Sequence, residues 1–213
     1  IIPGKNLWKE TYQKVRSGLI FLERVKEIPD QRQTVELVER YKNEVRFLIA
    51  YYYSRMLEVY GPFPLITSLM DVNDSGEVLK KERTPYDEIV NYLDNEFMEL
   101  SKILPSSYDN VNIGRPTSGA CLALRARMLM FAASPLFNER TIEPGNELVG
   151  YATYDRNRWN LAAEAAKEII TQFGPEGSGT LGLTSDYRNI FLNFYDKSNN
   201  PELIFCKAYD GVN

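Results

Sequence analysis

The chain has 213 residues and a formal net charge of −4, a size that suits one large domain or part of a bigger one. It contains no histidine, so it lacks the usual general base and the commonest metal ligand, and Ser-His and Cys-His nucleophile schemes are excluded. The weakly acidic balance argues against a nucleic-acid partner and against a polybasic membrane patch. Hydrophobic residues make up 44% of the sequence, which is enough to build a real core.

The first half of the sequence predicts three helices. Apolar residues at helical spacing predict a helix over residues 7–26 and a second over 34–60. The second ends at the Gly-Pro-Phe-Pro run of 61–64, because proline cannot continue a helix. A polar loop follows, and a third helix is predicted over 84–104, with Thr84 as its N-cap and a proline at the first helical position.

The second half continues the helical pattern. A fourth helix, rich in alanine, is predicted over residues 116–134, and a fifth over 157–173 after an irregular insertion at 135–156. A short helix at 187–195 and a strand at 202–209 complete the prediction. The fold class predicted is mainly α: degenerate tetratricopeptide-like helix pairs that form a right-handed helical scaffold with decorated loops.

Several stretches of the sequence resemble the SusD-like (RagB/SusD) family. Residues 46–66 form an aromatic helix that leads into a Tyr-Gly-Pro-Phe-Pro-Leu-Ile turn. Residues 83–89 read Arg-Thr-Pro-Tyr-Asp-Glu-Ile, and residues 114–138 run from Gly-Arg-Pro-Thr-Ser-Gly-Ala to Ala-Ser-Pro-Leu-Phe-Asn. A Trp-x₂-Ala-Ala helix at 159–166 and an Asn-Pro-Glu-Leu-Ile-Phe segment at 200–205 follow in the family's order. The resemblance covers nearly the whole chain.

The resemblance implies a binding protein and no enzyme activity. It implies that residues 1–213 form a single SusD-like helical domain, incomplete at both ends. Such proteins are lipid-anchored on the extracellular face of the outer membrane of Gram-negative, Bacteroidetes-type bacteria. They capture oligosaccharides, or in some members peptides, for a SusC-like TonB-dependent transporter. The expected function is therefore glycan capture for import, with no cofactor, no catalytic residue, and an N-terminal lipid anchor that is absent from this chain.

Two tyrosines are the candidate ligand-binding residues within this chain. The resemblance implies that sugars are held by aromatic rings that stack on pyranose faces, with Asn, Asp and Arg side chains bonded to hydroxyl groups. Tyr151 and Tyr154, in the insertion at 135–156, are the aromatic residues expected to be exposed. The alternative is that both tyrosines only anchor an ordinary loop by packing.

The other aromatic and alanine-rich positions are expected to be structural. Trp8, Tyr52 and Trp159 recur at helical spacing, which is typical of core residues. Cys121 and Cys206 are flanked by apolar residues and are interpreted as small core side chains, and a disulfide between them is left open. The residues predicted to be buried are Leu93, Phe97, Ala123, Leu124, Ala163 and Ala166.

A loop at residues 71–82 matches the EF-hand calcium pattern in composition. Oxygen-bearing side chains occupy its first, third, fifth and twelfth positions, from Asp71 to Glu82, and glycine occupies the sixth. The context differs from an EF-hand, because the prolines at 62 and 64 leave no full helix before the loop and a new helix begins just after it. We therefore expect no metal site and no calcium requirement for folding.

Two other functions remain as alternatives. A helical-repeat adaptor that binds proteins needs a concave face of charged and aromatic residues. A glycoside hydrolase on a helical scaffold needs two facing carboxylates at a set separation, and no distinctive acidic motif is present.

Overall fold

The protein is mainly α-helical, as predicted. The computed structural model describes residues 6–26, 34–70, 73, 80–139, 142–192 and 200–206. Its elements are α1 (Leu7–Arg24), α2 (Val35–Tyr60), α3 (Tyr86–Ile103), the 3₁₀ helix η2 (Asn110–Asn112), α4 (Ser118–Ala133), α5 (Pro135–Asn138), α6 (Asn157–Phe173) and α7 (Tyr187–Leu192). No strand forms within these described residues.

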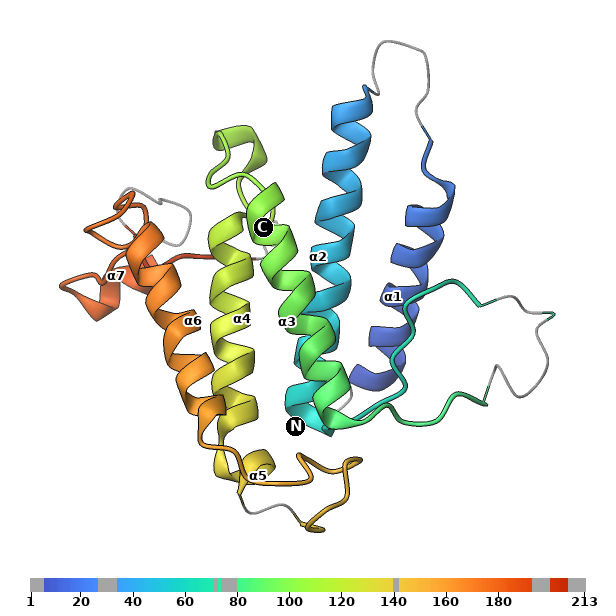
Figure 1. The fold of residues 1–213 in the computed structure, drawn as a ribbon. Coiled ribbons are helices and arrows are strands. Elements are labelled where there is room, and N and C mark those ends of the chain that lie inside the picture. Colours follow the sequence, from blue (N-terminus) through green and yellow to red (C-terminus); the bar gives the residue numbers. More distant parts are fainter. Residues whose placement is uncertain are drawn as a thin grey trace.

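The long helices lie side by side and alternate in direction along the chain. Figure 1 shows α6, α4, α3, α2 and α1 in this order from left to right, with α5 at the lower end of α4. Contacts join α1 to α2, α2 to α3 and α4, α3 to α4, and α4 to α6. Each helix therefore packs against the next long helix in sequence, as expected for antiparallel helix pairs.

Short polar side chains and a glycine define the helix ends. The Thr34 hydroxyl accepts a hydrogen bond from the Leu37 N–H at the start of α2, and the Thr117 hydroxyl accepts one from the Ala120 N–H at the start of α4. Gly61 ends α2 with φ of +66°, a left-handed conformation that costs glycine little.

The predicted cap at Thr84 is wrong. Its hydroxyl instead accepts a hydrogen bond from the Leu65 N–H at 3.2 Å, so α3 begins after Pro85 without a side-chain cap. Two further bonds hold the segment after α2: the Tyr12 hydroxyl donates to the Pro64 carbonyl at 2.7 Å, and the Tyr53 hydroxyl donates to the Ile66 carbonyl at 2.8 Å. Thr84 therefore fixes the proline-rich turn against the start of α3.

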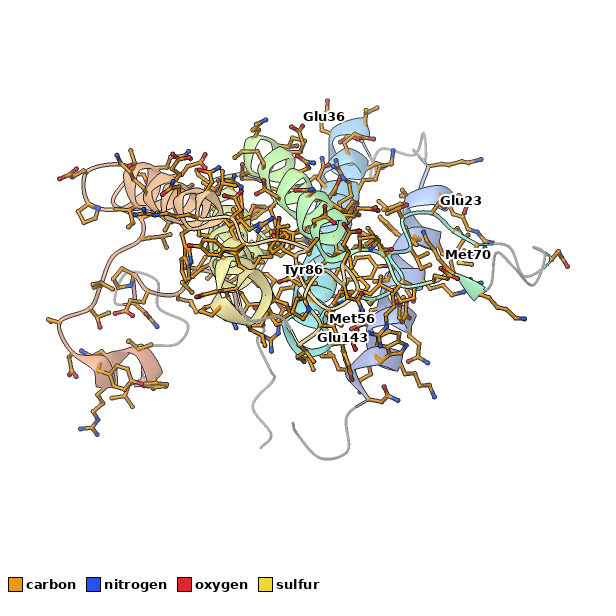
Figure 2. All side chains as sticks on the ribbon, turned by 60° about the horizontal axis from the view of Figure 1, so that its bottom comes forward. Glu23, Glu36, Met56, Met70, Tyr86 and Glu143 are labelled. Carbon is orange, nitrogen blue, oxygen red and sulfur yellow. The ribbon has the colours of Figure 1, made fainter. Side chains whose placement is uncertain are left out.

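The core lies between α1, α2, α3 and α4. Phe47 and Tyr53 of α2 meet Leu93 and Phe97 of α3, and all four side chains are fully buried. The predicted burial of Leu93 and Phe97 is confirmed. Figure 2 shows the fully buried Met56 among the crowded side chains between the helices.

The burial predicted for α4 and α6 is only partly correct. Ala123, Leu124 and Ala166 are half-buried, and Ala163 is exposed. Trp159 is 40% exposed, so its assignment to the core is wrong. The reason is the rotation of α6, which buries Ala162, Ala165 and Phe173.

Trp8 and Tyr52 are half-buried and pack against the edge of the core. Their predicted core role therefore holds only in part.

Both cysteines are free thiols. Cys121 is buried, and burial raises the pKa of its thiol to about 12. Cys206 is half-buried at the end of the 200–206 segment. Residues 202–206 form a turn and irregular structure, so the predicted strand does not form there, and 207–209 lie outside the described residues.

Replacing Phe97 with alanine should destabilise the protein strongly. The side chain is fully buried between α2 and α3, and emptying such a site costs about 3–5 kcal/mol. Ile170→Ala on α6 is the matched control, because Ile170 is 65% exposed and surface changes stay within about 0.5 kcal/mol. Urea unfolding of both variants measures the difference, and equal unfolding midpoints would contradict the packing described.

A buried carboxylate links α2 to the connection before α4. Glu44 is 8% exposed, and its carboxylate accepts hydrogen bonds from Arg115 at 2.6 Å and from the Tyr108 hydroxyl at 3.2 Å. Arg40 adds an ion pair at 3.5 Å from the preceding helical turn. The connection between α3 and α4 is therefore fixed electrostatically to α2.

Glu44→Ala should reduce the free energy of unfolding by about 1–3 kcal/mol, because it leaves Arg115 and Tyr108 without their shared acceptor. Glu99→Ala is the control, since Glu99 pairs with Lys102 on the surface and such pairs contribute about 0–1 kcal/mol. Chemical denaturation compares the two variants. Equal losses of stability would refute the structural role of Glu44.

Candidate functional site

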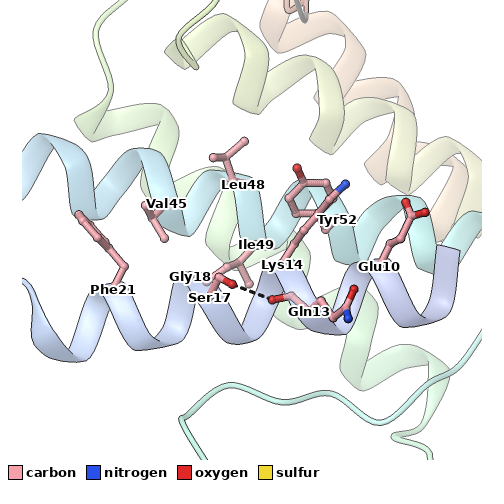
Figure 3. A pocket seen from close by; sticks show the side chains of 10 residues that line it. All are labelled: Glu10, Gln13, Lys14, Ser17, Gly18, Phe21, Val45, Leu48, Ile49 and Tyr52. Atoms are coloured by element: carbon pink, nitrogen blue, oxygen red, sulfur yellow. Dashed lines mark hydrogen bonds between the residues drawn. The ribbon is translucent and has the colours of Figure 1, made fainter. Parts of the chain in front are cut away.

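A groove between α1 and α2 is the candidate ligand site. It has a volume of about 490 Å³ and opens along the two helices (Figure 3). α1 contributes mainly polar side chains and α2 mainly apolar ones. The lining residues are Glu10, Gln13, Lys14, Ser17, Gly18 and Phe21 of α1 and Val45, Leu48, Ile49 and Tyr52 of α2.

Gly18 sets the distance between the two helices beside this groove. A Cβ atom added at Gly18 would lie 3.0 Å from Ile49 Cδ1 and 3.2 Å from Val45 Cγ1, closer than ordinary van der Waals contact. The absence of a side chain therefore lets α1 approach α2 closely, and the larger side chains on either side line the hollow.

The groove combines an aromatic ring with hydrogen-bonding groups. Lys14 Nζ lies 4.6 Å from the centre of the Tyr52 ring, a cation–π contact worth about 0.5–1 kcal/mol at an exposed site, so a ligand can displace it. Glu10 and Gln13 add a carboxylate and an amide at the rim (Figure 3). Apolar ring faces beside amide and carboxylate groups match the alternating C–H and hydroxyl surface of a sugar.

Sequence reasoning missed this groove because its aromatic and aliphatic residues recur at helical spacing. Three consecutive tyrosines on α2 illustrate the difficulty. Successive residues of an α-helix point about 100° apart, so Tyr53 enters the core while Tyr52 lines the groove. The signal available in the sequence was the run of three tyrosines itself, because three consecutive helical residues cannot all point to the same buried face.

The structure places Tyr151 and Tyr154 in different environments. Tyr151 is half-buried: its ring packs edge-on against Tyr86 at 5.0 Å, and the Arg158 guanidinium lies 3.6 Å from its centre. Burial also raises the pKa of its hydroxyl to about 12. Tyr151 therefore anchors the insertion and is not the exposed residue that was expected, whereas Tyr154 is 56% exposed and free to meet a ligand.

Most of the calcium-like loop at 71–82 lies outside the described residues, so the expectation about calcium stays a prediction. Within the described ranges, no three acidic, cysteine or histidine side chains gather in a way that could hold a metal ion.

None of the helices in the described part of the chain is both long enough and apolar enough to span a bilayer.

Comparison with known proteins identifies the family. The sequence model of a SusD-like family described as "Starch-binding associating with outer membrane" matches residues 3–130. The chain therefore belongs to the SusD-like family, whose carbohydrate-binding members are non-catalytic. No curated protein is similar enough in sequence to count as a match.

Solved structures share the fold. The protein BT4246 is 27% identical with a TM-score of 0.75, and the match covers 89% of this chain and 33% of that one. A SusD-like protein from Bacteroides fragilis is 22% identical with a TM-score of 0.70, covering 98% and 34%. A laminarin-binding SusD-like protein is 16% identical with a TM-score of 0.64, covering 90% and 35%. This chain thus spans about a third of the length of these structures.

Proposed function

We propose that this protein captures glycans at the bacterial outer surface without turning them over. Membership of the SusD-like family is the observation that carries the proposal, because the family is described as starch-binding and associated with the outer membrane. One structural neighbour is described as laminarin-binding and another as a surface glycan-binding protein from Bacteroides uniformis. A protein-binding adaptor has no comparable support.

The proposal extends to the fate of the captured glycan. As the family resemblance implies, the oligosaccharide passes to a SusC-like TonB-dependent transporter. A lipid anchor holds the protein beside that transporter. Tyr52 and the rim groups of the α1–α2 groove supply an aromatic platform and hydrogen-bonding partners. Tyr154, exposed on the insertion, is the second candidate platform.

Tyr52→Ala should weaken oligosaccharide binding by about 1–3 kcal/mol, the scale measured for base–aromatic stacking. Isothermal titration calorimetry with the glycan selected from an oligosaccharide array measures this loss. Because Tyr52 also packs against the core edge, Gln13→Ala provides a second variant whose exposed side chain is not needed for folding. Gln13→Ala should also weaken binding.

Tyr187→Ala on α7 is the matched control, because Tyr187 is 75% exposed and does not line the groove. Its affinity should equal that of the unchanged protein. A loss of binding in Tyr154→Ala but not in Tyr52→Ala or Gln13→Ala would move the site to the insertion.

The protein should leave its glycan ligands intact. It has no histidine, and the described residues contain no metal-binding cluster. Prolonged incubation with bound oligosaccharides, followed by chromatography of the products, checks this expectation. Shortened products that persist after further purification of the protein would contradict a purely binding role.

A further inference from the structure

A second hollow lies between α2 and α4, away from the α1–α2 groove. It has a volume of about 630 Å³, large enough to admit a sugar residue. Two arginines line it together with small and aromatic side chains, and none of the described residues that line it carries a carboxylate. The lining residues are Tyr51, Arg55, Ala120, Ala123, Leu124, Arg127, Ile204 and Phe205.

The two arginines share a single carboxylate. Arg127 Nε and Nη2 donate to the two oxygens of Glu58 at 2.8 and 3.3 Å, and Arg55 Nη1 donates to the same group. Among the described residues, no other carboxylate forms an ion pair with either guanidinium. The cluster therefore keeps one net positive charge, in a chain whose overall charge is −4.

Another arginine on α4 shows the opposite arrangement. Arg125 is 13% exposed at its side chain and pairs with two carboxylates, Asp94 at 2.6 Å and Glu168 at 3.1 Å. The two carboxylates more than neutralise the charge of Arg125, as expected for an arginine that joins helices. Arg127, two residues later, is 59% exposed at its side chain and shares its only carboxylate partner in the described structure. Arg127 and Arg55 thus remain able to bind a further anion.

The floor of the hollow is apolar. The rings of Tyr51 and Phe205 meet edge to face at 5.8 Å, and Ala120 and Ala123 have side chains too small to fill the space beside them. An apolar floor with aromatic rings accepts the C–H face of a sugar ring, and guanidinium groups bind carboxylate or sulfate through charge-assisted hydrogen bonds.

We propose that this α2–α4 hollow binds an anionic sugar residue, so that acidic glycans are the preferred ligands of this protein. The inference rests on the proposed glycan-binding function and adds the chemical class of the ligand. Carboxylate on a uronic acid and sulfate ester on a sugar present the same chemistry to Arg55 and Arg127, and the experiment below separates the two.

Two pairs of probes test the proposal by calorimetry. The first pair is tetragalacturonate and its methyl ester, in which esterification removes the charge of each carboxyl group. The second is a κ-carrageenan tetrasaccharide, which carries sulfate and no carboxylate, and its desulfated form. The charged member of at least one pair should bind at least about tenfold more tightly, which corresponds to about 1.4 kcal/mol, because the guanidinium groups donate charge-assisted hydrogen bonds to the anion. This advantage should shrink as salt rises.

The double variant Arg55→Met, Arg127→Met should lose the preference for the charged probe. Both side chains are partly exposed, so the fold should survive, which unfolding curves verify. Arg188→Met, an exposed position on α7, is the matched control and should keep the preference. A preference that persists in the double variant, or that disappears equally in the control, would overturn the proposal.

The outcome also separates this proposal from the general one. If neutral oligosaccharides bind as tightly as their charged counterparts, the acidic-glycan inference is wrong and glycan capture stands. If no oligosaccharide of either kind binds, both proposals are wrong.

Discussion

The burial of one face of α2 is the interaction on which the rest of the structure depends. Phe47, Ala50, Tyr53, Met56 and Leu57 lie on this face with exposures of 0–1%, and α1, α3 and α4 all contact α2. Burying a side chain of this size contributes about 1.5–3 kcal/mol. α2 therefore positions α1, α3 and α4, the three helices that pack against it.

The remaining surface of α2 lines both of the hollows described above. Tyr53 points into the core, Tyr52 lines the groove with α1, and Tyr51 lines the hollow with α4. Because consecutive residues are rotated by about 100°, three adjacent tyrosines reach three different environments. The element that stabilises the fold therefore also supplies the aromatic rings of the two proposed ligand sites, and the rigidity of the core fixes their positions.

The charged side chains also divide into those that hold helices together and those that are available to a ligand. Glu44 and Arg125 are largely buried and fully paired, and they fix the α3–α4 connection and the packing of α4 against α3 and α6. Arg55 and Arg127 are more exposed and share one partner, so their charge is available to a ligand.

The sequence by itself determined the long helices and their approximate ends, because helical periodicity and proline breaks act over a few neighbouring positions. The motifs at 46–66, 83–89 and 114–138 indicated the family by resemblance. It also identified Leu93 and Phe97 as buried, since they lie centrally in a strongly amphipathic helix. It could not decide how far α6 is rotated about its axis, so Trp159 and Ala163 were assigned to the wrong face.

Only the tertiary structure decided which side chains face a hollow, because that depends on helices distant in sequence. Tyr151 is covered by Tyr86 and Arg158, while Tyr52 remains open beside Gly18. A periodic apolar pattern in the sequence shows that a residue lies on the packing face of its helix. The distance between that helix and its neighbour decides whether the residue is fully covered or lines a hollow that a ligand can enter.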